Sequence, residues 1–89
     1  MDLEQIKDSI VTSVYHIDAS KKVPLHKHNN SDEIFYCIAG CGYGVLEESE
    51  VELTVGKVFV VPAGIMHSLR TDKEFYISSF LIPVAKEAD

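Results

Sequence analysis

Hydrophobic residues along this chain gather in short runs that are separated by turn-forming residues. The runs are rich in β-branched and aromatic side chains, and they cover residues 10–18, 22–28, 33–39, 43–48, 51–55, 58–61, 67–71 and 75–82. Most glycines and prolines lie between these runs, where turns require them. Short strands separated by regular turns are typical of antiparallel sandwiches and barrels. We therefore predict an all-β fold, a small antiparallel double-sheet β-barrel of about eight short strands.

Apart from the beginning of the chain, the sequence shows no helical periodicity. A short helix or irregular arm is expected over residues 2–8, so residues 1–9 are assigned to an N-terminal arm. Residues 85–89 are expected to form a frayed tail. The 89 residues contain no linker or repeat, and this length accommodates one domain, which we assign to residues 1–89.

Several predicted strands are apolar on both faces, whereas a sheet exposed on one side should alternate apolar and polar residues. In the run 33–39, Phe35 and Cys37 share one face while Ile34 and Tyr36 share the other. A domain this small cannot bury both faces of several strands by itself. We expect one outer sheet face to pack on a second copy in a homodimer. The alternative is that the N-terminal arm alone covers these residues.

Composition and charge exclude several classes of function. The chain is 46% hydrophobic and 25% charged, as globular proteins are, and its net charge is −6. Because it has no cluster of lysines and arginines, neither nucleic acid nor an anionic membrane is an expected partner. It also shows no signal peptide and no apolar run of the ~18 residues needed to span a bilayer. A cytoplasmic location is therefore expected.

The two cysteines, Cys37 and Cys41, are too few for a disulfide framework. We favour two free thiols in a reducing cytosol. A bridge between them, or a metal-binding pair, is the alternative.

The positions of the histidines indicate a metal site. His26 and His28 are two residues apart, so their rings project from the same face of an extended strand. Residues 29–32 are turn formers, and a chain that turns there can bring Glu33 back beside both imidazoles. His67 is the third histidine of the pattern. His16 has no such partner, and we expect it to have a surface or structural role.

The order and spacing of these residues resemble the two sequence motifs of the cupin superfamily. In this chain they read His26-x-His28-x4-Glu33-x6-Gly40 and Gly56-x5-Pro62-x-Gly64-x2-His67. Ser20, Lys57 and Thr71 depart from the family's pattern, at turn and strand-end positions and not at ligands. The resemblance implies a jelly-roll barrel, and it implies that His26, His28, Glu33 and His67 are the metal ligands.

Three imidazoles and one carboxylate suit one transition-metal ion, namely Fe, Mn, Ni, Zn, Co or Cu, and do not suit Ca. Four protein ligands on a six-coordinate ion leave two positions for water, dioxygen or a chelating substrate. A structural zinc site would more often be closed and rich in cysteine.

Alternation along the predicted strands suggests which residues line a pocket beside the metal. Phe35 and Cys37 share the face of Glu33, Leu69 shares that of His67, and Tyr43 and Val45 are expected to face inward opposite them. Core packing is the alternative role for most of them. No second Glu, Lys or Arg is clearly placed near the metal as a general base. Tyr15, Tyr36 and Tyr76 are further candidates, and the sequence does not determine which way they face.

The resemblance permits a small metal-dependent enzyme of the dioxygenase, isomerase or lyase class that acts on a small molecule. The alternative is a non-catalytic module that binds or senses a small-molecule ligand with the help of the metal. A purely structural metal is a third possibility.

Overall fold

The computed structural model describes residues 2–84, which form one short helix and six strands. The helix is α1 (Leu3–Ser9). The strands are β1 (Val11–Asp18), β2 (Ser31–Leu46), β3 (Glu50–Thr54), β4 (Val58–Val61), β5 (His67–Arg70) and β6 (Glu74–Pro83). All strand pairs are antiparallel.

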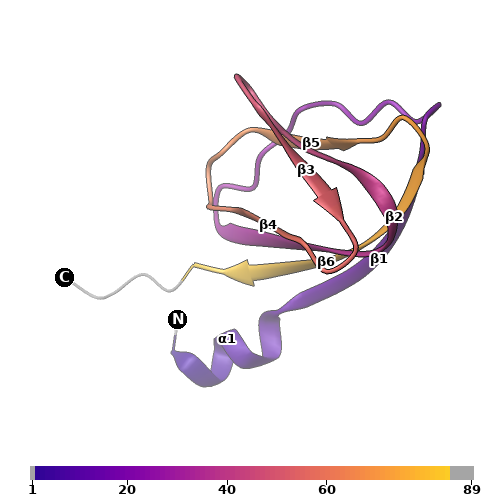
Figure 1. The fold of residues 1–89 in the computed structure, drawn as a ribbon. Helices are drawn as coiled ribbons and strands as arrows, with labels where there is room; N and C mark the ends of the chain where they lie inside the picture. The colour runs from indigo at the N-terminus through magenta and orange to yellow at the C-terminus, as the bar shows by residue number, and fades with distance from the viewer. Residues whose placement is uncertain (1, 85–89) are drawn as a thin grey trace.

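The long strand β2 belongs to both layers of the barrel (Figure 1). Its first part, up to Gly40, pairs with β4 on one side and with β6 on the other, and β6 pairs with β1. Its second part, from Cys41, pairs with β3 and β5 in the other layer. This arrangement confirms the predicted all-β double-sheet barrel, although six strands replace the expected eight.

A bulge and three glycines allow β2 to turn from one layer into the other. The register with β6 shifts between Cys37 and Ala39, and Gly40 has a φ of +78°, which a residue with a side chain rarely adopts. Gly42 lies against the Phe75 ring, where a Cβ atom would be only 2.7 Å from the ring carbons. The glycine-rich segment that we expected to be a turn is therefore a bend within one strand.

The predicted strand over residues 22–28 is also absent as such. One bridge remains there, in which His26 N donates to His67 O (3.0 Å) and His67 N donates to His26 O (2.8 Å). Pro24 has no backbone N–H to extend this ladder. The connection between β1 and β2, residues 19–30, thus closes the barrel beside β5 through one pair of backbone hydrogen bonds and through the Ser68 hydroxyl, which donates to Val23 O (2.7 Å).

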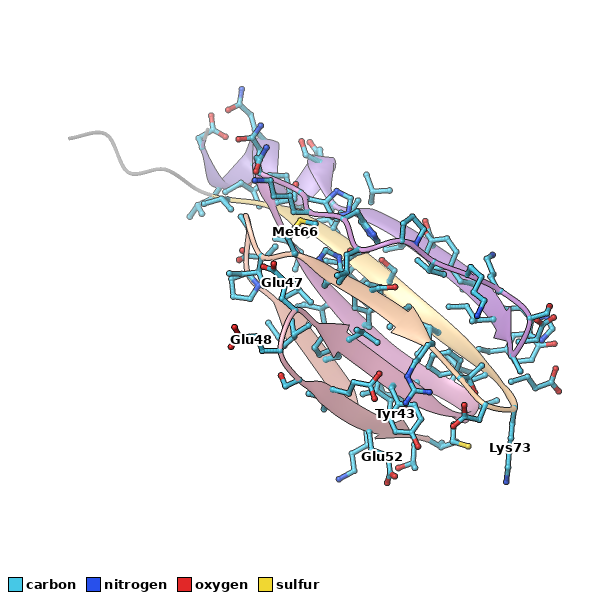
Figure 2. The ribbon with its side chains drawn as sticks, turned by 90° about the horizontal axis from the view of Figure 1, so that it is seen from above. Tyr43, Glu47, Glu48, Glu52, Met66 and Lys73 are labelled. Atoms are coloured by element: carbon cyan, nitrogen blue, oxygen red, sulfur yellow. The ribbon has the colours of Figure 1, made fainter. Side chains whose placement is uncertain are left out.

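The turns lie at the two ends of the barrel. Figure 2 shows Glu48, in the β2–β3 turn, and Lys73, in the β5–β6 turn, at opposite ends of the molecule. Glu47 and Met66 lie at the same end as Glu48 (Figure 2). This end also contains His67, which pairs with Leu46 at the start of β5.

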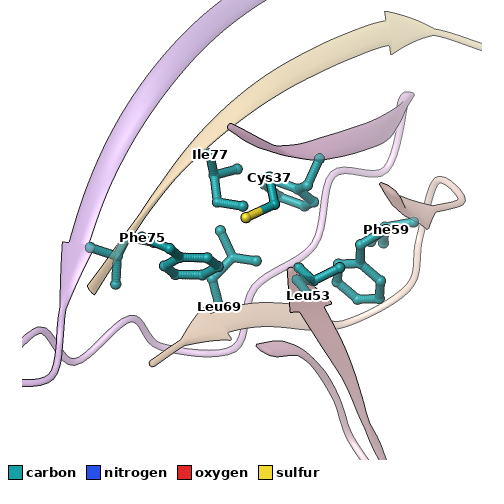
Figure 3. Packing of buried hydrophobic residues seen from close by; sticks show 9 residues of the cluster. Cys37, Leu53, Phe59, Leu69, Phe75 and Ile77 are labelled. Carbon is teal, nitrogen blue, oxygen red and sulfur yellow. The ribbon is translucent and has the colours of Figure 1, made fainter. Parts of the chain in front are cut away.

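The core fills the space between the two layers, as the close view in Figure 3 shows. Its members are the buried apolar residues Ile17, Phe35, Cys37, Leu53, Phe59, Val61, Leu69, Phe75 and Ile77. Every named strand contributes to this core. All buried side-chain N and O atoms of the described residues have a hydrogen-bond partner.

Helix α1 forms the N-terminal arm and is fixed by a capping box. The Asp2 side chain accepts from Gln5 N (2.9 Å), and the Gln5 side chain accepts from Asp2 N (3.0 Å). In the described part of the chain, no helix is long and apolar enough to cross a membrane. The expected frayed tail, residues 85–89, lies outside the described residues.

One face of the barrel remains apolar and exposed. This outer face belongs to the layer of β1, β6, β4 and the first part of β2, and its exposed apolar residues include Val14, Tyr36, Val58, Val60 and Tyr76. These side chains are 41–65% exposed although α1 contacts β6. The N-terminal arm alone therefore does not cover this face.

Candidate metal centre

Three separate parts of the backbone bring the four predicted ligands together. Glu33 lies near the start of β2, between Val61 of β4 and Leu81 of β6, and faces into the barrel. His67 begins β5 and is 1% exposed, while His26 and His28 come from the connection that bridges to it. One ligand atom from each of the four residues lies within 4.8 Å of the other three.

Backbone carbonyl groups determine which nitrogen of two of these histidines carries the proton. The Nδ1–H of His26 donates to Pro24 O (3.0 Å), and the Nδ1–H of His67 donates to Ile65 O (2.8 Å). A carbonyl oxygen can only accept, so Nδ1 must carry a hydrogen in both rings. In the neutral imidazole, Nε2 then presents its lone pair to the cluster, as metal-ligating histidines do.

Within the cluster, one oxygen atom of Glu33 lies close to the ring nitrogens of two histidines. The Glu33 Oε1 atom lies 2.9 Å from His67 Nε2 and 3.3 Å from His28 Nε2. An ionised carboxylate only accepts, and a neutral His67 with its hydrogen on Nδ1 has none to donate from Nε2. A proton shared by the two atoms, or a metal ion bound to both, accounts for the short contact between Glu33 Oε1 and His67 Nε2.

The size of the cluster agrees with a single ion. Ligand atoms at ~2.1 Å from a transition metal lie ~4.2 Å apart when they are on opposite sides. The observed separations, up to 4.8 Å, are close to that value. Glu33 Oε2 is held in addition by the Ser79 hydroxyl, which donates to it at 2.5 Å. The donor set and its spacing thus fit one transition-metal ion.

A cavity of about 250 Å³ opens beside the four candidate ligands. Its wall is mainly apolar and includes Tyr15, Ile17, Lys21, Val23, His26, His28, Glu33, Phe35, Leu69 and Leu81. Phe35 and Leu69, two of the five residues predicted to line a pocket, are part of this wall. The Phe35 ring also lies against the His67 ring, with 5.9 Å between the ring centres.

The other three predicted lining residues lie elsewhere. Cys37 faces inward but is completely buried in the core, and this burial raises the pKa of its thiol, so it is not disposed to act as a thiolate. The bulge after Cys37 reverses the alternation of β2, so that Gly42 and Gly44 are the buried residues. Tyr43 and Val45 consequently do not line the cavity.

Tyr43 makes its contacts on the other side of β2. Its ring lies 4.2 Å from the Arg70 guanidinium, and Figure 2 shows it beside Glu52, its register partner on β3. Arg70 also forms an ion pair with Glu50, and this contact holds the pKa of the Glu50 carboxyl below its usual range. These residues form a surface cluster that is separate from the cavity.

Sequence reasoning missed the residues that support or complete the site from β1 and β6. On β6 the inward side chains Phe75, Ile77 and Leu81 are apolar, and Ser79 between them is polar. A polar residue on an otherwise apolar strand face was the sequence signal that could have identified Ser79. The facing of Tyr15 was left open, and Lys21 lies in a connection whose path has no periodic pattern.

His16 and Cys41 lie outside the candidate metal centre. His16 is exposed on the outer face, where its ring stacks on Tyr76 at 4.5 Å and its Nε2 lies 2.8 Å from Glu74 Oε2. Cys37 and Cys41 are both free thiols. No bridge joins the two cysteines.

Comparison with known proteins identifies relatives of this arrangement. The sequence model of the cupin domain matches residues 13–81. Acireductone dioxygenase 2 of Arabidopsis thaliana is 32% identical over 77 residues, which cover 81% of this chain and 40% of that protein. This chain therefore spans about two fifths of the length of the curated relatives that it matches.

Solved structures share the fold of this chain. A predicted oxalate decarboxylase from Thermotoga maritima gives a TM-score of 0.78 at 21% identity, covering 94% of this chain and 76% of that one. The DMSP lyase DddQ from Ruegeria pomeroyi gives 0.77 at 26% identity, covering 91% of this chain and 42% of that one.

Proposed function

Because this chain belongs to the cupin domain family, we propose that it binds one divalent transition-metal ion through His26, His28, Glu33 and His67. The observation that carries the proposal is the cluster itself, in which one ligand atom from each of the four residues lies within 4.8 Å of the other three and the Nε2 atom of His67 lies 2.9 Å from Glu33 Oε1. Nitrogen and oxygen ligands of this kind suit Fe, Mn, Ni, Zn, Co or Cu.

The surrounding residues would orient these ligands. The carbonyl groups of Pro24 and Ile65 hold the two imidazoles with Nε2 directed into the cluster. The Ser79 hydroxyl holds the second oxygen of Glu33. A bound ion would supply Lewis-acid or redox chemistry to a small oxygen-bearing substrate in the adjacent cavity.

We further propose that the chain is a metal-dependent enzyme of the dioxygenase, isomerase or lyase class. We place the dioxygenase class first because the curated relatives are acireductone dioxygenases. One fold carries many chemistries, so this assignment depends on measured turnover. The alternative is a binding or sensing module, which would hold a small molecule beside the metal without converting it.

Metal content tests the first proposal. Untagged protein, purified without an immobilised-metal column, should contain close to one equivalent of a transition metal by elemental mass spectrometry. His28→Ala should lose most of this metal; it is the variant of choice because His28 is partly exposed, whereas His67 is buried. His16→Ala, on the outer face, should keep its metal. Folded wild-type protein that binds no added metal would refute the proposal.

Oxygen uptake tests the reaction class. Protein loaded with Fe, Ni or Mn is mixed with acireductone in an oxygen electrode, with His28→Ala as the control. Uptake that His28→Ala abolishes supports the dioxygenase class. Saturable binding of a ligand without uptake or product would favour the binding module.

The assembly of the chain is also a proposal. We propose that two copies pack through the outer face, since its exposed valines and tyrosines form an apolar sheet surface.

A further inference from the structure

Lys21 is the one lysine or arginine among the residues that line the cavity beside the candidate metal centre. Lys21 lines this cavity together with Tyr15, while the rest of the wall is made mainly of apolar residues. Lys21 lies in the connection between β1 and β2, the same segment that supplies His26 and His28. A lysine at this position bears on which molecules can enter.

The backbone at Lys21 is fixed by a turn that follows β1. Lys21 N donates to Asp18 O (3.1 Å), and Asp18 Oδ1 accepts from Ser20 N (2.9 Å) and from Ser20 Oγ (2.6 Å). These bonds from Ser20 lower the pKa of the Asp18 carboxyl. Asp18, the acidic residue closest to Lys21 in sequence, therefore uses Oδ1 to accept hydrogen bonds from Ser20.

No ion pair neutralises Lys21 within residues 2–84, where the structure records none for it. The chain as a whole has a net charge of −6, which repels anions. An unpaired ammonium group next to an apolar wall provides local attraction that opposes this repulsion. The cavity therefore carries a local positive charge at Lys21, although the whole molecule is negatively charged.

The strand register separates two of the lining residues, Glu33 and Tyr15, along β6. Glu33 is aligned with Leu81 on β6, whereas Tyr15 is aligned with Ile77. These two positions on β6 are separated by about 13 Å at ~3.3 Å per residue. The carboxylate of the metal centre and the phenol thus lie towards different ends of the cavity. Its volume of about 250 Å³ equals that of about eight water molecules at ~30 Å³ each, so an occupant must be small.

We propose that this cavity binds a small carboxylate with an apolar body and that Lys21 is the residue that selects it. The carboxylate pairs with the Lys21 ammonium group, and the body lies against Phe35, Leu69 and Leu81. Lys21 N donates to Asp18 O, and Asp18 is aligned with Glu74, seven residues along β6 from Leu81, so the end of the ligand opposite its carboxylate faces the histidine cluster. This orientation rests on the proposed function, because it assigns the reacting end of the substrate to the metal.

Calorimetric titration of metal-loaded protein with hexanoate, and with its neutral isostere hexanamide, tests the proposal. Hexanoate should bind more tightly, and sodium chloride should reduce the difference through screening. Lys21→Met should weaken hexanoate binding about fivefold, as a partly exposed ion pair allows, and should leave hexanamide unaffected. Lys21→Arg should restore the preference. Lys22→Met is the matched control, because both lysines line a neighbouring groove but only Lys21 also lines the cavity.

Metal analysis of the same samples separates the two proposals. If Lys21→Met retains both its metal and its preference for hexanoate, the carboxylate is not paired with Lys21 and the inference is wrong. If no sample contains metal, the proposed function fails, yet the preference for hexanoate and its dependence on Lys21 can still be measured. Equal weakening by Lys21→Met and Lys22→Met would indicate a general effect of surface charge and would overturn the inference.

Discussion

A single hydroxyl group restrains the carboxylate of the candidate metal centre. Ser79 is 2% exposed and donates to Glu33 Oε2, so Oε1 is left to face the histidines. We predict that Ser79→Ala weakens metal binding by ~10–100-fold, the usual effect of removing a partner that orients a ligand. Competition with a chelator of known affinity measures the change.

Ser78→Ala is the matched control for this variant. Ser78 lies next to Ser79 on β6 but on the opposite face, where it pairs with Tyr36 and Val14. The Ser78→Ala variant should bind metal with the affinity of the wild type. Equal affinity of Ser79→Ala and the wild type would show that Glu33 needs no such restraint.

Single residues also show where prediction from sequence succeeds. The histidine spacing and the turn formers before Glu33 brought His26, His28 and Glu33 together, because short spacings depend on local geometry, whereas His67, 34 residues further on, was added by the resemblance to the two motifs. Tyr43 and Val45 were placed on the wrong face, since one extra residue at the bulge reverses every later position of the strand. The sequence could not predict that Lys21 lines the cavity, because a connection without apolar and polar alternation does not show which way its side chains point.

At the scale of elements, β2 depends on inward glycines that make room for aromatic rings of its neighbours. A Cβ atom at Gly44 would overlap the Phe59 ring from β4. We therefore predict that Gly44→Ala destabilises the protein by ~1–3 kcal/mol, the range for overpacking a core. Urea denaturation followed by circular dichroism measures the free energy of unfolding.

A second substitution tests whether this overlap is the cause. Phe59→Leu alone should also destabilise the protein, because it leaves a gap in the core. In the double variant the smaller leucine gives the new methyl group space, so the combined loss should be smaller than the sum of the two. Strictly additive losses would attribute the effect of Gly44→Ala to another cause.

Most strands were predictable because their β-branched and aromatic runs are bounded by turn residues. The exceptions have physical reasons. The glycines at 40 and 42 resemble a turn in sequence, but they accommodate the Glu74–Phe75 backbone and the Phe75 ring beside a continuous strand. Residues 22–28 have the composition of a strand, yet Pro24 limits their ladder to one bridge with His67.

At the scale of the whole molecule, the outer face was predicted from the two-sided apolar pattern. The structure leaves it exposed, with Val58 at 49% and Val60 at 57%. A standard interface buries ~800 Å² per partner, about one seventh of the 5901 Å² surface of this chain. One sheet face is of suitable size for such an interface.

Sedimentation velocity tests the dimer that we propose. The wild type should sediment as a dimer at micromolar concentration, because association removes this apolar surface from water. Val60→Glu should sediment as a monomer, since two copies would each bury an unpaired carboxylate. Val55→Glu is the control, because Val55 is 63% exposed but lies in the turn between β3 and β4, and it should remain dimeric. A wild type that stays monomeric, or dissociation by both variants alike, would exclude this face as the interface.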